Sequence, residues 1–185
     1  MTRLRALTRD DLVPADRQVY DAIAARRGGV PPNYHVLLHS PQAAARMAAL
    51  GTYIRFESPL PARTKALALL TTARETDGDY VWTMNQPHAA TAGLTADLIT
   101  AIRERRALAS LAPEDAAIIR FTLELLTQHR IAEATFRAVQ CQLGDAGVVE
   151  ILLLIGYYAS LSHAASALEI LPSRLSTLSG ERPSG

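Results

Sequence analysis

The sequence predicts an all-α protein, and two features of the chain support this. Apolar residues recur at helical spacing in segment after segment, and glycine or proline separates these segments. No stretch shows the sustained alternation of apolar and polar residues, bounded by hairpin turns, that is typical of strands. We therefore expect helices packed on helices and essentially no sheet.

The N-terminal part contains two predicted helices joined by an extended connection. Residues 13–27 form an amphipathic stretch that should end at Gly28, because glycine is a common helix stop. Residues 30–34 should be extended, since proline disfavours helical backbone in the residue before it. Pro41 suits a first helical position after Ser40, a good N-cap, which predicts a helix over residues 41–56.

Six further helices complete the prediction. They cover residues 62–76, 80–92, a short helix capped by Thr95, 113–129, 132–143 and 145–168. We expect about eight helices in a single domain over residues 1–171. Residues 172–185, rich in Ser, Arg, Gly and Pro, should form a flexible tail.

The composition narrows the class of protein. Hydrophobic residues make up 49% and charged residues 20%, which is typical of a folded globular chain. The net charge of +1 gives no basic surface for nucleic acid. The N-terminus carries charges where a signal peptide would be apolar. The apolar segment 148–171 contains Glu150, His163 and Glu169, so we expect the core helix of a cytoplasmic protein and no membrane partner.

Cysteine and histidine spacing excludes two kinds of site. Cys141 is the single cysteine, so the chain can form neither an internal disulfide nor a CxxC pair, and we expect a small core residue there. His35 and His39 have a spacing that suits a metal, but no third ligand follows at a sensible distance. We predict no metal site and no cofactor.

Three stretches of the chain together form a pattern seen in a known family. The first comprises Leu60-Pro-Ala-Arg-Thr-Lys-Ala-Leu-Ala-Leu-Leu, then Tyr80-Val-Trp, then Ala89 and Gly93-Leu. The second comprises Arg130-Ile-Ala-Glu-Ala-Thr-Phe, Gly147-Val-Val-Glu-Ile and Ile155-Gly-Tyr-Tyr, and the third is Leu37-Leu-His-Ser-Pro. The pattern resembles the long, cysteine-free branch of the carboxymuconolactone decarboxylase-like family, which includes the alkyl hydroperoxidase D (AhpD) proteins. The resemblance implies an AhpD-like fold and homo-oligomers, trimers or hexamers, with sites near subunit contacts.

The resemblance also indicates which chemistry is missing. The family's two peroxidase cysteines fall on Gly78 and Val81, its glutamate on Ala66 and its histidine on Asn85. Without thiols the chain should not be a thiol peroxidase. Decarboxylase members use the same glutamate and histidine positions, so other residues would have to carry out proton transfer here.

Three residues are our candidates for catalysis. Asn85 and His88 lie at helical spacing from Val81, so His88 could act as acid or base and Asn85 could orient substrate. Alternatively, His88 is a surface or subunit-contact residue and Asn85 has no role. Glu150 lies among apolar residues and needs a partner, which makes it either catalytic or a structural hydrogen-bonding group.

Five residues are candidates for binding substrate. Tyr80 and Trp82 could form aromatic walls for a flat ring, or be ordinary core aromatics. Tyr34 and His39 could close one side of the cavity. Arg63 could bind a substrate carboxylate, with surface solvation as the alternative. Glu75 should face solvent or pair with Arg74 or another exposed cation.

These observations predict a cofactor-independent enzyme of lyase or isomerase type. Its substrate would be a small cyclic or carboxylated metabolite, such as a carboxymuconolactone-like lactone. The first alternative is a non-catalytic protein that kept the fold to bind a small molecule or to assemble. The second is a peroxidase that borrows cysteines from a partner.

Overall fold

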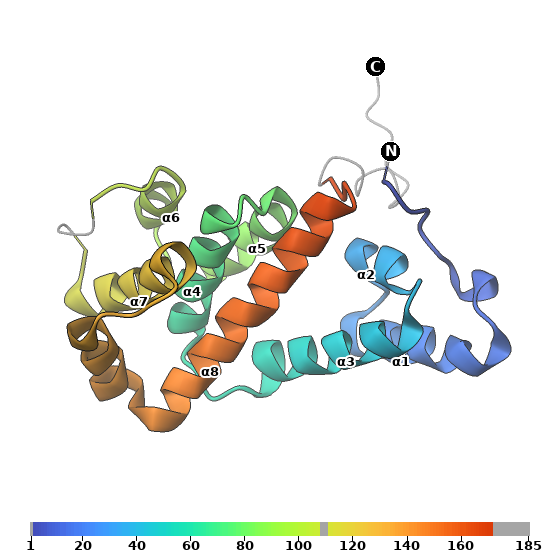
Figure 1. Cartoon of the computed structure of the whole chain (residues 1–185), viewed down its shortest axis with the longest axis horizontal. Helices are drawn as coiled ribbons and strands as arrows, with labels where there is room; N and C mark the ends of the chain where they lie inside the picture. Colours follow the sequence, from blue (N-terminus) through green and yellow to red (C-terminus); the bar gives the residue numbers. More distant parts are fainter. Residues whose placement is uncertain (1, 108–110, 172–185) are drawn as a thin grey trace, which may run out of the picture. The chain divides into compact units, whose positions relative to one another are not determined.

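The computed structural model describes residues 2–107 and 111–171, and all regular structure in these ranges is helical (Figure 1). Eight α-helices are present there and no strand, which confirms the all-α prediction. The chain divides into two compact units, Met1–Glu57 with Ala164–Gly185 and Ser58–His163. The single domain expected over residues 1–171 stays a prediction. The predicted flexible tail, residues 172–185, lies outside the described residues.

The first unit contains α1 (Arg17–Arg27), α2 (Pro32–Leu37) and α3 (Pro41–Thr52). α1 ends where predicted, because Gly28 adopts a left-handed φ of 71°. α3 begins at Pro41, as predicted, and continues into a π-helical turn over Tyr53–Glu57. The helices share a core that includes the buried side chains Leu7, Leu12, Val19, Ile23, Tyr34 and Leu38.

The predicted extended connection at residues 30–34 is wrong in its second half, where α2 forms. Pro31 is extended, with φ −61° and ψ 147°, as the effect of a following proline requires. Pro32, however, is the first residue of α2, where its ring suits the helical φ and no N–H is needed. The second proline therefore starts a helix that the sequence prediction did not anticipate.

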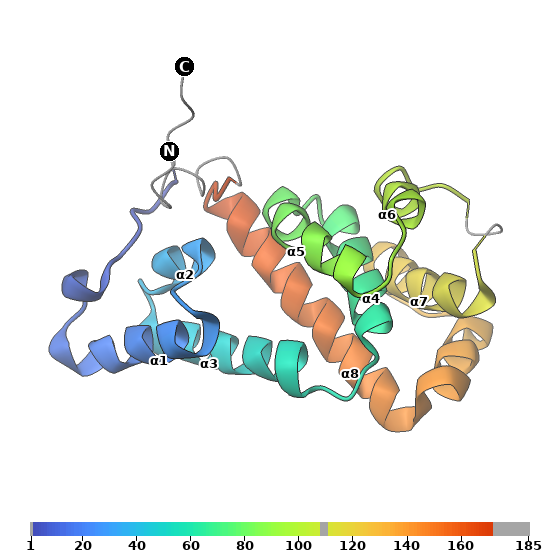
Figure 2. The ribbon, with the colours of Figure 1, turned by 180° about the vertical axis from the view of Figure 1, so that it is seen from behind.

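The second unit is built around α4 (Ala62–Glu75), which lies between α5 (Asp79–Thr91) and α7 (Pro113–Leu123) (Figures 1 and 2). α6 (Ala96–Arg103) packs against both α4 and α5. As predicted, Thr95 caps α6, with its hydroxyl accepting a hydrogen bond from the Leu98 N–H at 3.2 Å. α7 continues as a π-helical segment over Glu124–Gln128. Residues 67–73 of α4 are all buried, as suits a helix covered on several sides.

The longest helix, α8 (Glu133–Ala167), contains the predicted break. Gly144 has non-helical backbone angles, φ 71° and ψ 175°, and divides α8 where two separate helices were expected. By length and composition alone α8 could cross a membrane, and only 33% of its most apolar window is buried. The expected core helix is therefore buried on one side only, since Ile151, Leu154 and Ile155 are buried whereas Val149, Leu152 and Leu153 are exposed.

Arg63 joins three segments of the second unit. Its guanidinium makes two hydrogen bonds to the Asp115 carboxylate of α7, at 2.9 and 2.6 Å, and a third to the Gly93 carbonyl after α5. The Asp115 side chain is only 10% exposed, whereas that of Arg63 is 42% exposed. The hydrogen bond to Asp115 raises the pKa of Arg63 above its ordinary value. A largely buried carboxylate thus depends on this one cation.

Replacing this arginine should destabilise the protein. Arg63→Leu leaves the Asp115 charge without its partner, and we expect a loss of about 2 kcal/mol in the free energy of unfolding, below the range for fully buried pairs because solvent screens Arg63. Arg137→Leu is the control, because Arg137 pairs with Glu133 at the surface, and it should cost less than about 0.5 kcal/mol. Urea unfolding measures both. Equal losses of unfolding free energy in the two variants would contradict the dependence of the Asp115 carboxylate on Arg63.

Candidate functional site

The start of α5 is closed to any side chain at position 78, where the resemblance places a peroxidase cysteine. A Cβ added to Gly78 would overlap the hydroxyl and Cβ of Ser162 on α8. Ser162 is fully buried, and its hydroxyl has no hydrogen-bond partner among the described residues. Ser162 therefore occupies the space that a thiol at position 78 would need.

The predicted catalytic pair does not share a buried pocket. Val81 and Asn85 are buried, and the Asn85 amide nitrogen donates to the Val81 carbonyl at 2.7 Å. His88 is exposed, although its spacing from Val81 places it near the same side of α5. Ala89, the next residue, is buried, so the covered side of α5 runs through Val81, Asn85 and Ala89, and His88 lies at its edge. That His88 and Asn85 serve one site stays a prediction.

A polar pocket of about 210 Å³ lies where α4 turns into α5. Trp82 lines it with only a small part of its indole, since the residue is 7% exposed, and the Arg103 guanidinium at the end of α6 lies over the ring, 5.8 Å from its centroid. The Trp82 indole N–H donates to Gln86 at 3.1 Å, which orients the ring. Ala73, Arg74, Asp77 and Asp79 complete the lining.

The groups around this pocket are held by contacts between helices. The Arg74 Nε donates to the backbone carbonyl of Arg103 at 2.6 Å, which ties the end of α6 to α4. Arg74 also pairs with Asp77 at 3.2 Å, and Asp77 has a left-handed φ of 47°, an uncommon conformation for a residue with a side chain. Asp79 is the first residue of α5, where the helix dipole favours a carboxylate. Such local backbone strain often accompanies functional sites.

This arrangement combines a cation held over a buried indole with two carboxylates. The guanidinium can meet negative charge on a ring that binds beside it. Carboxylates can accept or deliver a proton when they reach the reacting atom. Among the described residues, no group of three or more His, Cys, Asp or Glu could hold a metal ion.

Two predicted binding residues serve the structure of the first unit. The imidazole of His39 contacts the Arg5 carbonyl at 3.0 Å, and that of His35 contacts the Leu7 carbonyl at 2.7 Å. Both histidines thus secure the N-terminal segment against α2. Tyr34 is buried in the core of this unit, 5.1 Å from the guanidinium of Arg27.

The other predicted residues belong to the second unit. Arg63 is engaged with Asp115, and its role in binding a substrate carboxylate stays a prediction. Tyr80 is buried, and Glu150 is half-buried on α8. Cys141 is exposed rather than a core residue. It lies two residues beyond the buried Val139, about 200° further around the helix.

The sequence prediction did not include Arg103 or Asp79 among the site residues, and it did not place the Glu75 side chain in a buried position. The Glu75 side chain is 8% exposed and pairs with Arg105 at 2.9 Å, so the expected pairing with a cation is confirmed but the solvent-facing position is not. Arg103 belongs to the charged run at residues 103–106, and such a run at a helix end does not by itself indicate a site. The signal that could have found it is its place in the last turn of a helix that follows Trp82, although spacing does not show which helices meet.

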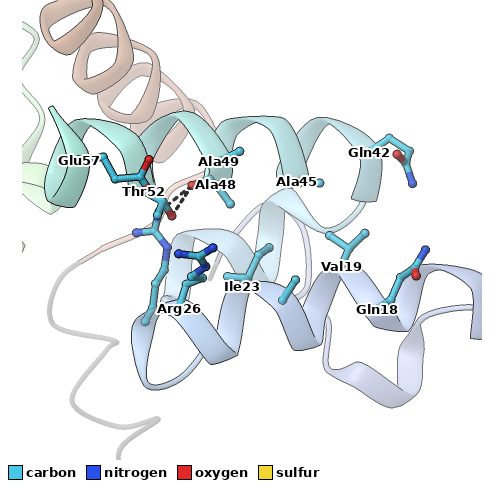
Figure 3. Close-up of a pocket in the computed structure, with 12 residues that line it drawn as sticks. Gln18, Val19, Ile23, Arg26, Gln42, Ala45, Ala48, Ala49, Thr52 and Glu57 are labelled. Carbon is cyan, nitrogen blue, oxygen red and sulfur yellow. Dashed lines mark hydrogen bonds between the residues drawn. The ribbon is translucent and has the colours of Figure 1, made fainter. Parts of the chain in front are cut away.

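The first unit has a groove of about 580 Å³ between α1 and α3 (Figure 3). Ala45, Ala48 and Ala49 form one side, and Arg26 and Gln18 extend from the opposite helix (Figure 3). Both polar side chains belong to exposed or half-exposed residues of α1. Half of its lining residues are polar, namely Gln18, Arg26, Arg27, Gln42, Thr52 and Glu57, but none is aromatic. We therefore take the pocket beside Trp82, which combines an aromatic residue with charged groups, as the candidate site.

Comparison with known proteins supports the fold. No model of a known protein family matches the sequence, and no curated protein matches it. The debrominase Bmp8, as a single-residue variant in complex with 2,3,4-tribromopyrrole, has a TM-score of 0.73 at 16% identity over 97% of each chain. The same debrominase without ligand has a TM-score of 0.71 at 16% identity, over 94% of this chain and 95% of the other.

A third structure links the chain to AhpD. It is a protein of unknown function from Agrobacterium tumefaciens that has been suggested to be the antioxidant defence protein AhpD. Its TM-score is 0.65 at 18% identity, over 71% of this chain and 91% of the other. The chain therefore has an AhpD-like helical fold.

The close contact at Gly78 leads to a stability prediction. Gly78→Ala should destabilise the protein by about 2 kcal/mol, because the new methyl group overlaps Ser162. In a Ser162→Gly background the same change should cost much less, since both overlapping atoms are removed. Gly156→Ala on α8 is the control, because its added Cβ meets nothing within 4 Å. Thermal unfolding of the four variants tests this, and an equal cost of Gly78→Ala in both backgrounds would contradict it.

Proposed function

We propose that this chain is a cofactor-independent enzyme of lyase or isomerase type, acting on a small cyclic, carboxylated metabolite such as a carboxymuconolactone-like lactone. The observation that carries the proposal is the Arg103 guanidinium above the Trp82 ring, with Asp79 lining the same pocket. A ring bound beside Arg103 would place its oxygen substituents near the guanidinium and its ring carbons near a carboxylate.

The chemistry follows from these roles. When carbon dioxide leaves a lactone that carries a carboxylate, the electron pair of the broken bond passes into the conjugated carbonyl and gives an enolate. Arg103 stabilises the negative charge on that oxygen, as preorganised cations do at developing oxyanions. Asp79 exchanges the proton that the ring carbon gains or loses, directly or through one water. An isomerisation passes through the same kind of enolate, which forms when a ring carbon loses a proton and ends when another carbon gains one.

One of the compared structures supports a small flat ring as the substrate class. Bmp8 is a debrominase described with 2,3,4-tribromopyrrole, a small flat ring, so an AhpD-like fold can hold a ligand of this kind. The present chain departs from thiol chemistry, because Ser162 fills the space at Gly78 and Cys141 is exposed and alone. Both facts favour proton transfer over redox chemistry.

The sequence-based site remains an alternative within the same function. It assigns proton transfer to His88 and the orientation of substrate to Asn85, with Glu150 as a further carboxylate. The exposure of His88 weighs against it. A non-catalytic protein that only binds a small ring is the second candidate function, since the pocket beside Trp82 would also suit binding without turnover.

Self-association is part of the proposal. Val149, Leu152 and Leu153 are exposed on one side of α8, at spacings that place apolar side chains close together. Such a surface suits contact with a second copy of the chain, as the family resemblance implies for a trimer or hexamer. Light scattering of the purified protein should give a multiple of the 20.0 kDa chain mass.

The function is tested with 4-carboxymuconolactone, by following substrate absorbance and carbon dioxide release. We expect Arg103→Met to lower kcat/KM by about 100-fold, as for loss of an oxyanion-stabilising group, and Asp79→Asn by a similar factor. Arg137→Met is the matched control, because it removes an exposed arginine outside the pocket, and it should change nothing.

Three outcomes distinguish the alternatives. Loss of turnover in His88→Ala but not in Arg103→Met would move the reaction to the sequence-based site. Tight binding of the lactone without release of carbon dioxide would favour the binding protein. Neither binding nor turnover of this lactone or of related cyclic acids would contradict the proposed substrate class.

A further inference from the structure

A second cavity, of about 190 Å³, lies among α4, α6 and α7 of the second unit. Most of its wall is apolar, formed by Ala101, Ile102, Leu111, Ile119 and Leu123. It shares no lining residue with the pocket beside Trp82. An engineered cavity of about 150 Å³ with apolar walls is large enough to bind benzene, so a ring of that size fits here.

One wall of this cavity carries a buried polar atom that has no partner in the part of the chain that the structure describes. Thr71 on α4 is only 1% exposed, and its hydroxyl has no hydrogen-bond partner among the described residues. Two nearby threonines of the same segment behave differently. The hydroxyls of Thr72 and Thr76 donate to the carbonyls of Ala68 and Thr72, each at 2.7 Å.

The difference points to a ligand. A threonine in a helix commonly satisfies its hydroxyl with the carbonyl four residues before it. A buried hydroxyl without a partner costs free energy, and each such group in a folded protein calls for an explanation. A molecule in the cavity that hydrogen-bonds to Thr71 supplies one.

The rim of the cavity carries charged side chains that form an ion pair with each other. Glu75, one turn after Thr71, accepts two hydrogen bonds from Arg105, at 2.9 and 3.4 Å. Because its charge is balanced, Glu75 offers an oxygen without strongly attracting a cation. The interior therefore favours an uncharged ligand with one polar group.

Arg105 is held at this rim by an unusual backbone. It has a left-handed φ of 53° at the end of α6, where its N–H donates to the Ile102 carbonyl at 3.2 Å and that of Arg106 donates to the Ala101 carbonyl at 2.9 Å. This is the helix-ending turn that usually has glycine at the left-handed position. An arginine there accepts backbone strain while its side chain secures Glu75 at the cavity.

From these observations we infer that the cavity is a binding site for a small, uncharged monocyclic molecule with one hydroxyl group, of the phenol class. The ring packs among the apolar walls, and its hydroxyl bonds to Thr71. The inference does not depend on the proposed reaction, because the two sites are lined by different residues.

Binding of phenol to the full chain, measured by calorimetry, tests the inference. The wild type should bind one phenol per chain in a saturable way, and toluene more weakly. Thr71→Val keeps the shape but removes the hydroxyl, so it should weaken phenol binding about tenfold, the factor that corresponds to the loss of about 1.4 kcal/mol. It should also abolish the preference for phenol over toluene.

Two further variants make the result specific. Ala101→Leu, from a half-buried position on α6, should fill the cavity and abolish binding of both rings. Thr72→Val is the matched control, because Thr72 is equally buried on the same helix but does not line the cavity, and it should bind phenol as the wild type does.

The inference would be overturned by any of three results. Absence of saturable phenol binding to the wild type would mean that the cavity holds water or nothing. Unchanged binding in Ala101→Leu would place the ligand elsewhere. Unchanged phenol affinity in a folded Thr71→Val variant would show that the buried hydroxyl is not the partner.

Discussion

The second unit depends on the ion pair between Arg63 and Asp115. A carboxylate buried on α7 needs a cation, and Arg63 at the start of α4 supplies it while also bonding to the carbonyl of Gly93 after α5. The position of α4 is thereby set against two neighbours. Both sites depend on that placement, since α4 contributes Ala73 and Arg74 to one and Thr71 and Glu75 to the other.

The AhpD-like fold and the chemistry of this chain are separable. The fold rests on apolar faces and helix ends, which the sequence retains. The resemblance places thiol chemistry at Gly78 and Val81, and here the backbone at Gly78 packs directly against Ser162. Once a serine fills that space, no thiol can return without a second change. We propose that the polar groups beside Trp82 carry out proton transfer in the same part of the unit.

Local signals in the sequence predicted most of the fold. Gly28, Gly144 and Thr95 act within a few residues of themselves, and each lies at the boundary where it was expected. The sequence prediction missed α2 because Pro32 has two effects. It keeps the preceding Pro31 extended, and it is itself the first residue of the helix. The sites were harder to predict, because Arg103 meets Trp82 and Arg105 meets Glu75 across 21 and 30 residues of chain. Periodicity shows which side of a helix is apolar, but not which helix faces it.

The central claim is that an AhpD-like fold here works without thiols. Its most direct test is consumption of hydrogen peroxide with a dithiol as electron donor, by the wild type and by Cys141→Ser. The account predicts that both consume peroxide no faster than buffer, because Cys141 is exposed and has no second cysteine in the chain. Catalytic consumption that disappears in Cys141→Ser would contradict it and return the chain to peroxidase chemistry with a borrowed thiol.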